Sequence, residues 1–111
     1  MTTSSAGQRV GELNDAFRKS FIGGRVLVTA GVNAFSPGTR AQVIEKVQTF
    51  NNFTPENDPY LEHDFGSFKE EGEKFFWKIE YFDLTLEGHS TDASDPEKTV
   101  RVLTIMLASE Y

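Results

Sequence analysis

One run of apolar residues limits the folds open to this chain. Between Val100 and Ser109 apolar side chains fill both alternating sets, Val102, Thr104 and Met106 on one face of a strand and Leu103, Ile105 and Leu107 on the other. A strand that is apolar on both faces is typical of the middle of a sheet, where both faces are covered. The run is shorter than the ~20 residues that a membrane-spanning helix needs. It therefore predicts a central strand.

Two further strands are predicted upstream of this run. Residues 65–69 and 74–83 are strand-like, and the sequence Glu70-Glu71-Gly72-Glu73 between them is suited to a hairpin turn. Within 74–83 the residues at 75, 77, 79 and 81 alternate with those at 76, 78, 80 and 82, and both sets contain aromatic groups. Residues 84–98 form a polar, acidic connection. Short connections among these three strands favour an antiparallel meander.

The first half of the chain predicts two helices and one strand. After Ser4 or Ser5 as N-cap, apolar residues at 10, 13, 17 and 21 line one helical face, and Gly23-Gly24 is expected to end the helix. Residues 25–32 are predicted to form a strand. Ser36-Pro37 then opens a second helix, with apolar residues at 43, 44, 47 and 50.

These elements predict an α+β fold in the order α-β-α-β-β-β. We expect an antiparallel sheet of about four strands with two helices packed on one face. The length of 111 residues suits a single domain spanning 1–111, with residues 1–5 expected to be flexible. Because the last two strands carry apolar groups on both faces, either the loop 51–63 or another protein is expected to cover the second face.

Charge is distributed unevenly along the chain. It has 11 Lys and Arg against 17 Asp and Glu, a formal charge of −6. Residues 1–50 contain six basic and three acidic side chains, whereas residues 51–111 contain five basic and fourteen acidic ones. The acidic half argues against direct nucleic-acid binding there, because phosphate contacts come from Lys and Arg. It favours a basic protein surface as the partner.

Composition also excludes several classes of protein. No cysteine is present, so disulfides, thiolate zinc sites and cysteine nucleophiles are excluded. The first residues, Met-Thr-Thr-Ser-Ser, lack the basic and apolar regions of a secretory leader, and no apolar run predicts membrane insertion. We therefore expect a cytoplasmic protein without a membrane partner.

The acidic run admits two interpretations. The carboxylates could simply keep an aromatic-rich domain soluble. Alternatively they form a negative surface that binds a basic groove, with Trp77 either in the core or, if it lies away from the helices, as an interface anchor. On the second interpretation the predicted partner-binding residues are Glu70, Glu71, Glu73, Glu80, Asp83, Glu87, Asp92, Asp95, Glu97 and Trp77.

Candidate catalytic groups are few. His63-Asp64 could act as an acid–base pair or contribute two metal ligands, but adjacent residues of a strand point to opposite faces, so they could cooperate only from a loop. His89 and the nearby acids at 92, 95 and 97 do not have the ligand spacing of a calcium loop. Asp64-Phe65-Gly66 lacks the other kinase motifs. We predict no catalytic residue, metal ligand or cofactor.

The second half resembles a known family. The segments Asp64-Phe65-Gly66-Ser67-Phe68, 76–83 (FWKIEYFD) and 101–111 (RVLTIMLASEY) are similar to a family of small bacterial proteins of unknown function, and the first half is similar more loosely. Members of that family are commonly met on plasmids and other mobile elements, mostly in proteobacteria. The resemblance implies no activity and no catalytic residues. It implies the company of small accessory genes, some of which counter host defence.

Three functions follow as hypotheses. The first is a non-enzymatic DNA mimic of the anti-CRISPR or anti-restriction type, which blocks the basic nucleic-acid groove of a host nuclease, for example a CRISPR effector subunit. The second is a structural or regulatory homodimer joined through the uncovered sheet face. The third is a small metal-dependent hydrolase that uses His63 and Asp64.

Overall fold

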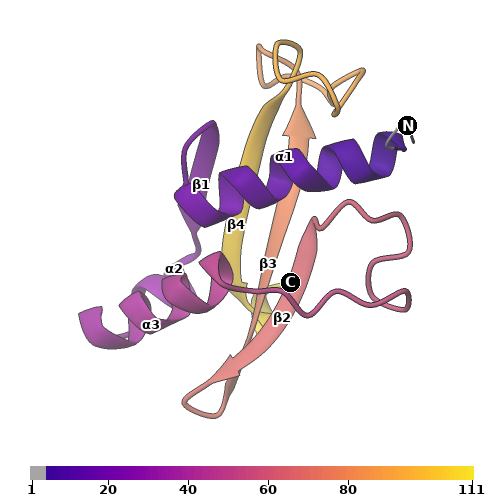
Figure 1. Ribbon diagram of the computed structural model, residues 1–111. Coiled ribbons are helices and arrows are strands. Elements are labelled where there is room, and N and C mark those ends of the chain that lie inside the picture. Colours follow the sequence, from indigo (N-terminus) through magenta and orange to yellow (C-terminus); the bar gives the residue numbers. More distant parts are fainter. Residues whose placement is uncertain (1–4) are drawn as a thin grey trace.

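The computed structural model describes residues 5–111 and has the predicted α+β architecture (Figure 1). Its elements are α1 (Ala6–Ser20), β1 (Gly24–Val28), α2 (Ala30–Asn33), α3 (Pro37–Gln48), β2 (Phe65–Glu70), β3 (Glu73–Phe82), β4 (Val100–Leu107) and the 3₁₀ turn η1 (Ala108–Glu110). Four strands form one sheet in the order β1-β4-β3-β2. The strand expected at the centre, β4, has a neighbour on each side.

The prediction that the whole sheet is antiparallel is wrong. β2, β3 and β4 form the expected antiparallel meander, but β1 pairs with β4 in parallel, with Val26 opposite Leu103. The sheet is therefore mixed. The cause is the crossover: β1 is followed by α2, α3 and a long loop, and only then by the meander that brings β4 to its side. Alternation of side chains reports which residues share a face, but not the direction in which distant strands pair.

The ends of α1 are set by local contacts. The Ser5 hydroxyl accepts a hydrogen bond from the backbone of Gln8, and the Gln8 side chain accepts one from the backbone of Ser5, which is a capping box. Ser5 is therefore the N-cap of α1, as one of the two predicted candidates, and residues 1–4 of the segment expected to be flexible lie outside the described range. The helix ends at Phe21, in the left-handed conformation, before the glycines predicted to end it.

The first strand is shorter than predicted. Residues 25–32 were expected to be extended, but β1 ends at Val28 and the short helix α2 follows. A carboxylate from the other end of the chain stabilises this change: Glu110 accepts hydrogen bonds from the Thr29 hydroxyl at 2.6 Å and the Gly31 N–H at 3.0 Å. These contacts hold the pKa of Glu110 below its usual value, the Thr29 hydroxyl contributing most.

The remaining local predictions are confirmed. Ser36 caps α3 and Pro37 occupies its first turn. The hairpin between β2 and β3 is a two-residue turn in which Glu71 and Gly72 have φ angles of 53° and 79°. Two positive φ angles in succession match the hairpin turn whose twist fits that of the adjoining strands.

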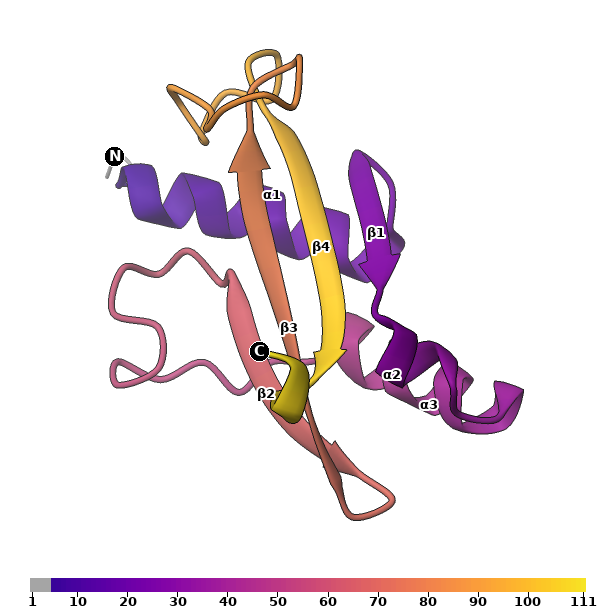
Figure 2. The ribbon, with the colours of Figure 1, turned by 180° about the vertical axis from the view of Figure 1, so that it is seen from behind.

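The core lies between the helices and one face of the sheet. α1 and α3 both pack on that face, as Figure 1 shows from the helix side and Figure 2 from the opposite side. The buried cluster combines helix residues such as Phe17 and Val43 with one alternating set of strand residues, which includes Trp77 and Ile105. The two predicted helices therefore cover one face, as expected.

The second face of the sheet is not covered by the loop 51–63. Phe53 in that loop stacks on His63 with the ring centroids 3.9 Å apart and meets Trp77 edge-on, so the loop packs on the helix side. On the second face, Tyr111 lies against Phe65 and Phe76. Among residues 5–111, the 3₁₀ turn η1 and Tyr111 lie over this face, and no α-helix covers it (Figure 2).

Candidate functional site

The predicted partner-binding carboxylates lie mainly at the two ends of the sheet. Glu70, Glu71 and Glu73 are at the β2–β3 hairpin, whereas the five at 83, 87, 92, 95 and 97 belong to the connection between β3 and β4. Figure 2 shows the hairpin at the bottom and that connection at the top. Glu80 is separate, because it lies in β3 on the face away from the helices. The acidic residues therefore form two end clusters rather than one continuous face.

Two of the hairpin carboxylates are bound to the rest of the fold. Glu70 forms an ion pair with Lys46 of α3, with N and O 3.1 Å apart. Glu71 accepts a hydrogen bond of 3.0 Å from the Thr39 hydroxyl. The side chain of Glu73 makes no hydrogen bond or ion pair with the described residues. At this end of the sheet, contacts with α3 hold Glu70 and Glu71, and the carboxylate of Glu73 remains available.

At the other end, aspartates shape the loop that carries them. Asp83 Oδ1 accepts hydrogen bonds from the Thr85 hydroxyl at 2.7 Å and from the backbone N–H groups of Thr85 and Glu87. Asp92 accepts from the Ser94 hydroxyl and backbone. These donors, above all the two hydroxyls, hold the pKa values of Asp83 and Asp92 below their usual range. Both carboxylates are therefore negative at neutral pH.

Few of these charges are neutralised by neighbouring cations. Glu70 pairs with Lys46, and Glu80 pairs with Lys78 at 3.2 Å. The other predicted carboxylates form no ion pair within residues 5–111, and they are Glu71, Glu73, Asp83, Glu87, Asp92, Asp95 and Glu97. The hairpin also carries Lys69 and Lys74 beside its carboxylates, so the excess of negative charge lies mainly at the connection between β3 and β4, where Lys98 and Arg9 are the cations that act on Asp92.

Trp77 does not belong to this surface. Its side chain is 0% exposed, and the guanidinium carbon of Arg18 lies 5.0 Å from the centroid of its ring. Its prediction as a partner-binding residue is thus corrected, and the alternative, a core position, holds. The reason is the alternation of side chains along a strand. Trp77 belongs to the same alternating set as Phe75 and Ile79, and this set faces the helices.

A buried polar network under α1 was missed by the sequence analysis. Asn14, fully buried, donates to the Glu62 carbonyl and to the Tyr81 hydroxyl, both at 2.8 Å, and accepts from Arg101 Nε at 2.7 Å. Burial lowers the pKa of Arg101 and raises that of Tyr81. The signal was present in the sequence, since Asn14 and Arg18 share the helical face of Val10 and Phe17 at four-residue spacing.

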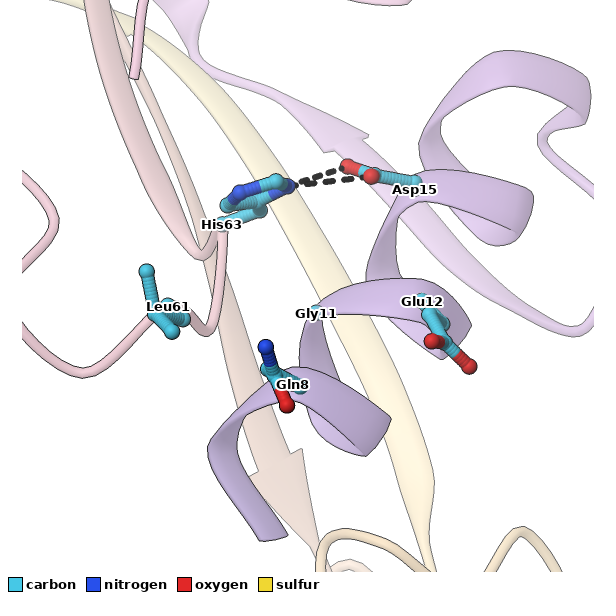
Figure 3. Close-up of a pocket in the computed structure, with 6 residues that line it drawn as sticks. All are labelled: Gln8, Gly11, Glu12, Asp15, Leu61 and His63. Atoms are coloured by element: carbon cyan, nitrogen blue, oxygen red, sulfur yellow. Dashed lines mark hydrogen bonds and ion pairs between the residues drawn. The ribbon is translucent and has the colours of Figure 1, made fainter. Parts of the chain in front are cut away.

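His63 lies in a pocket of about 270 Å³ between α1 and the loop that precedes β2 (Figure 3). Its Nδ1 is 3.0 Å from both carboxylate oxygens of Asp15, and its Nε2 is 3.3 Å from Asp58 Oδ2. Asp15 also accepts a 3.0 Å hydrogen bond from Arg18. Each ring nitrogen therefore faces a carboxylate of this chain rather than an open position at which a substrate could bind. This geometry favours a structural ion cluster.

Asp64 is not the partner of His63 in this cluster. Burial raises the pKa of Asp64, while the carboxylates that contact the imidazole come from Asp15 and Asp58. Within residues 5–111, no three His, Asp or Glu side chains are arranged so as to hold a metal ion. The same part of the chain contains no helix long and apolar enough to cross a membrane.

Comparison with known proteins agrees with the resemblance of the second half. The sequence model of one family, described as protein of unknown function (DUF3768), matches residues 28–110. The chain belongs to this family. The match extends upstream of the β-meander through α3 and α2 to Val28, the last residue of β1, so it includes only part of the more loosely similar first half, and α1 lies outside it. Searches of curated proteins and of solved structures gave no significant match.

Proposed function

We propose that this DUF3768 protein is a non-enzymatic inhibitor that binds a host defence nuclease complex of the CRISPR or restriction type. Its acidic ends dock in the basic groove that otherwise holds nucleic acid, in the cytoplasm of a cell that carries its gene on a mobile element. The observation that supports this proposal most is the set of seven carboxylates that have no ion-pair partner within residues 5–111.

The spacing of the two ends suits such a groove. They are separated by the length of β3, Glu73–Phe82, which is about 30 Å at the rise of an extended strand. One helical turn of duplex DNA is about 34 Å. Carboxylates at that separation could meet the cations that contact phosphates one turn apart, and the field of the acidic connection between β3 and β4 would accelerate association at low salt.

The uncovered sheet face is a poor candidate for the main contact with a basic groove. Arg25, Lys74 and Lys78 lie on that face, and the carboxylate of Glu80 is already paired with Lys78. Cations placed against a basic groove would repel it. The proposal therefore assigns the contact to the ends of the sheet and not to its surface.

A charge-reversal experiment tests the proposal without damaging the fold. The variant Glu73→Lys/Glu87→Lys/Glu97→Lys changes only side chains that make no hydrogen bond or ion pair with the described residues. The matched control, Glu12→Lys/Glu45→Lys/Glu56→Lys, changes the net charge equally at exposed positions outside both clusters. Binding to purified CRISPR effector and restriction complexes is then measured at low and high salt.

The end variant is expected to bind at least about tenfold more weakly at low salt, and the wild type should lose affinity steeply as salt increases. The control should bind within about twofold of the wild type. Equal loss in both triple variants would mean that only net charge matters. Absence of salt-sensitive binding, together with unimpaired nuclease activity, would refute the proposal.

A further inference from the structure

The two edges of the sheet are treated differently. β2 forms one edge, and α3 covers part of it: Lys46 Nζ donates to the Lys69 carbonyl at 2.7 Å and pairs with Glu70. A charged side chain placed over backbone acceptors blocks the addition of another strand. β1 forms the other edge, and no such contact is made to it within residues 5–111.

Exposed apolar side chains concentrate at the β1 edge. Leu27 and Val28 are 53% and 42% exposed, and Ile22, just before the strand, is 77% exposed. Arg25 is the only charged residue in β1. Apart from Arg25, β1 carries no charge that would protect this edge, and an exposed apolar edge strand is a template for pairing with another strand.

The backbone groups available at this edge can be identified. The Thr29 N–H donates to the Ile105 carbonyl of β4 at 3.1 Å. Because the N–H and C=O groups of successive residues point to opposite sides of a strand, and those of every second residue to the same side, the groups of Leu27 and Arg25 also face β4. The groups of Gly24, Val26 and Val28 therefore point away from the sheet.

We infer that the β1 edge binds the β1 strand of a second copy of this chain, in antiparallel orientation and centred on Val26. The inference is independent of the proposed function. In this register the three outward residues of each copy meet those of the other, which satisfies every outward donor and acceptor with about six hydrogen bonds. Gly24 lies opposite Val28, and Arg25 lies opposite Leu27.

This register is the one that suits the side chains. Placing Arg25 opposite Leu27 lets the aliphatic part of the arginine cover the leucine, while its charged end reaches water. Sliding the strands by two residues toward Arg25 would instead place the two arginines opposite each other, and like charges directly opposite are destabilising. Pairing centred on Val26 thus keeps the two arginines apart and uses all three outward residues of each strand.

Charge and edge protection are also compatible with a closed dimer. The acidic ends belong to β3 and its loops. In the dimer the two β3 strands are five strand spacings apart, which is about 24 Å. This separation is well beyond the Debye length of about 8 Å at physiological salt. The outer edges of the eight-stranded sheet are the two β2 strands, whose protection by Lys46 prevents further addition. Assembly therefore stops at two copies.

Sedimentation equilibrium over a range of concentrations tests the dimer. We expect the wild-type chain to form dimers, and the variant Leu27→Lys/Val28→Lys to be a monomer with unchanged circular dichroism, because both side chains are exposed. Tyr60→Lys is the matched control, since Tyr60 is 77% exposed and lies in the loop that precedes β2, the strand at the opposite edge of the sheet from β1. It should remain dimeric. A wild-type chain that is monomeric at all concentrations would overturn the inference.

Cysteine cross-linking tests the register. The chain contains no cysteine, so single substitutions introduce the only thiols. Arg25→Cys and Leu27→Cys chains are oxidised separately and as a mixture, and non-reducing gels are compared. The proposed pairing predicts efficient cross-linking in the mixture and little in either variant alone, because positions 25 and 27 face each other. Equal cross-linking in all three samples, or strong cross-linking of a Tyr60→Cys chain as well, would contradict it.

Discussion

Asn14 is expected to be the most sensitive polar position in the protein. Its side chain joins four elements, because it contacts the loop carbonyl of Glu62, the Tyr81 hydroxyl of β3 and Arg101 of β4 from its place on α1. The substitution Asn14→Ala removes all three hydrogen bonds and leaves the partners buried. The change tests whether this network stabilises the fold.

The size of the effect follows from the contacts. Two neutral hydrogen bonds contribute about 1 kcal/mol each, and the one from the buried guanidinium of Arg101 about 1.5–3 kcal/mol. Alanine regains about 0.6 kcal/mol through its higher helix propensity. The free energy of unfolding should therefore fall by about 3–4 kcal/mol, a large share of the roughly 5–15 kcal/mol typical of a domain. The melting temperature should fall by about 12–16 °C.

Urea unfolding followed by tryptophan fluorescence measures this loss. Trp77 is the only tryptophan and is fully buried, so its emission reports the packing of the core. Asn52→Ala is the control, because its side chain is exposed and makes no hydrogen bond with the described residues, and it should change the free energy of unfolding by less than about 0.5 kcal/mol. A loss below about 1 kcal/mol for Asn14→Ala would refute the reasoning.

Three further predictions concern the fold and its pH dependence. Gly66→Ala should destabilise the protein by about 1–3 kcal/mol in urea unfolding, because a Cβ there would lie 2.3 Å from Trp77 Nε1; an unchanged midpoint would contradict this packing. Gly72→Ala should cost about 1 kcal/mol by the same measurement, since its φ is +79° and nothing lies within 4 Å of the added methyl group. Burial, the largest cause, raises the pKa of Glu62 in the fold, so its stabilising contribution is present at acidic pH and is lost as the pH rises through the folded pKa. Glu62→Gln should therefore be more stable than the wild type at neutral pH, with a smaller difference at acidic pH; thermal melts at several pH values would expose the opposite trend.

The uneven distribution of charge has a structural explanation. The turn before β3 and the loop after it carry most of the carboxylates, whereas Lys74 and Lys78, together with Glu80, occupy the alternating set of β3 that faces away from the helices. The chain thus separates an acidic pair of ends from a sheet face that carries Lys74 and Lys78. The total of −6 hides this separation. For a charged partner, added salt should therefore change the affinity of binding at the ends and the affinity of binding at the sheet face in opposite directions.

Local patterns predicted most elements, because their causes are local. The N-cap at Ser36 with Pro37, the apolar face of α1 and the turn at Glu71-Gly72 all depend on residues within a few positions of one another. The limits of β1 were mispredicted because the contact that ends it comes from Glu110, 81 residues beyond Thr29. No window of sequence around β1 contains that information.

The candidate sites likewise divide into features with local causes, which the sequence predicted, and features that depend on distant segments, which it did not. The sequence located the acidic residues in the turns and loops around β3, but it did not reveal that Glu73 and Glu97 lie at opposite ends of one strand pair. The buried partners of Asn14 and the two carboxylates around His63 come from segments far apart in the chain. Such networks require coordinates, because hydrogen-bond partners follow from the packing of elements.

By itself the sequence determined the α+β composition of the fold, the central position of β4 and the hairpin, since side-chain periodicity and turn chemistry act over a few residues. Only the tertiary structure decided that β1 runs parallel to β4, that Trp77 is buried, and that one sheet edge is protected while the other is open. These outcomes depend on how the long crossover from β1 returns the chain to the sheet. That return is governed by packing of the whole core, to which every element contributes and which no single segment specifies.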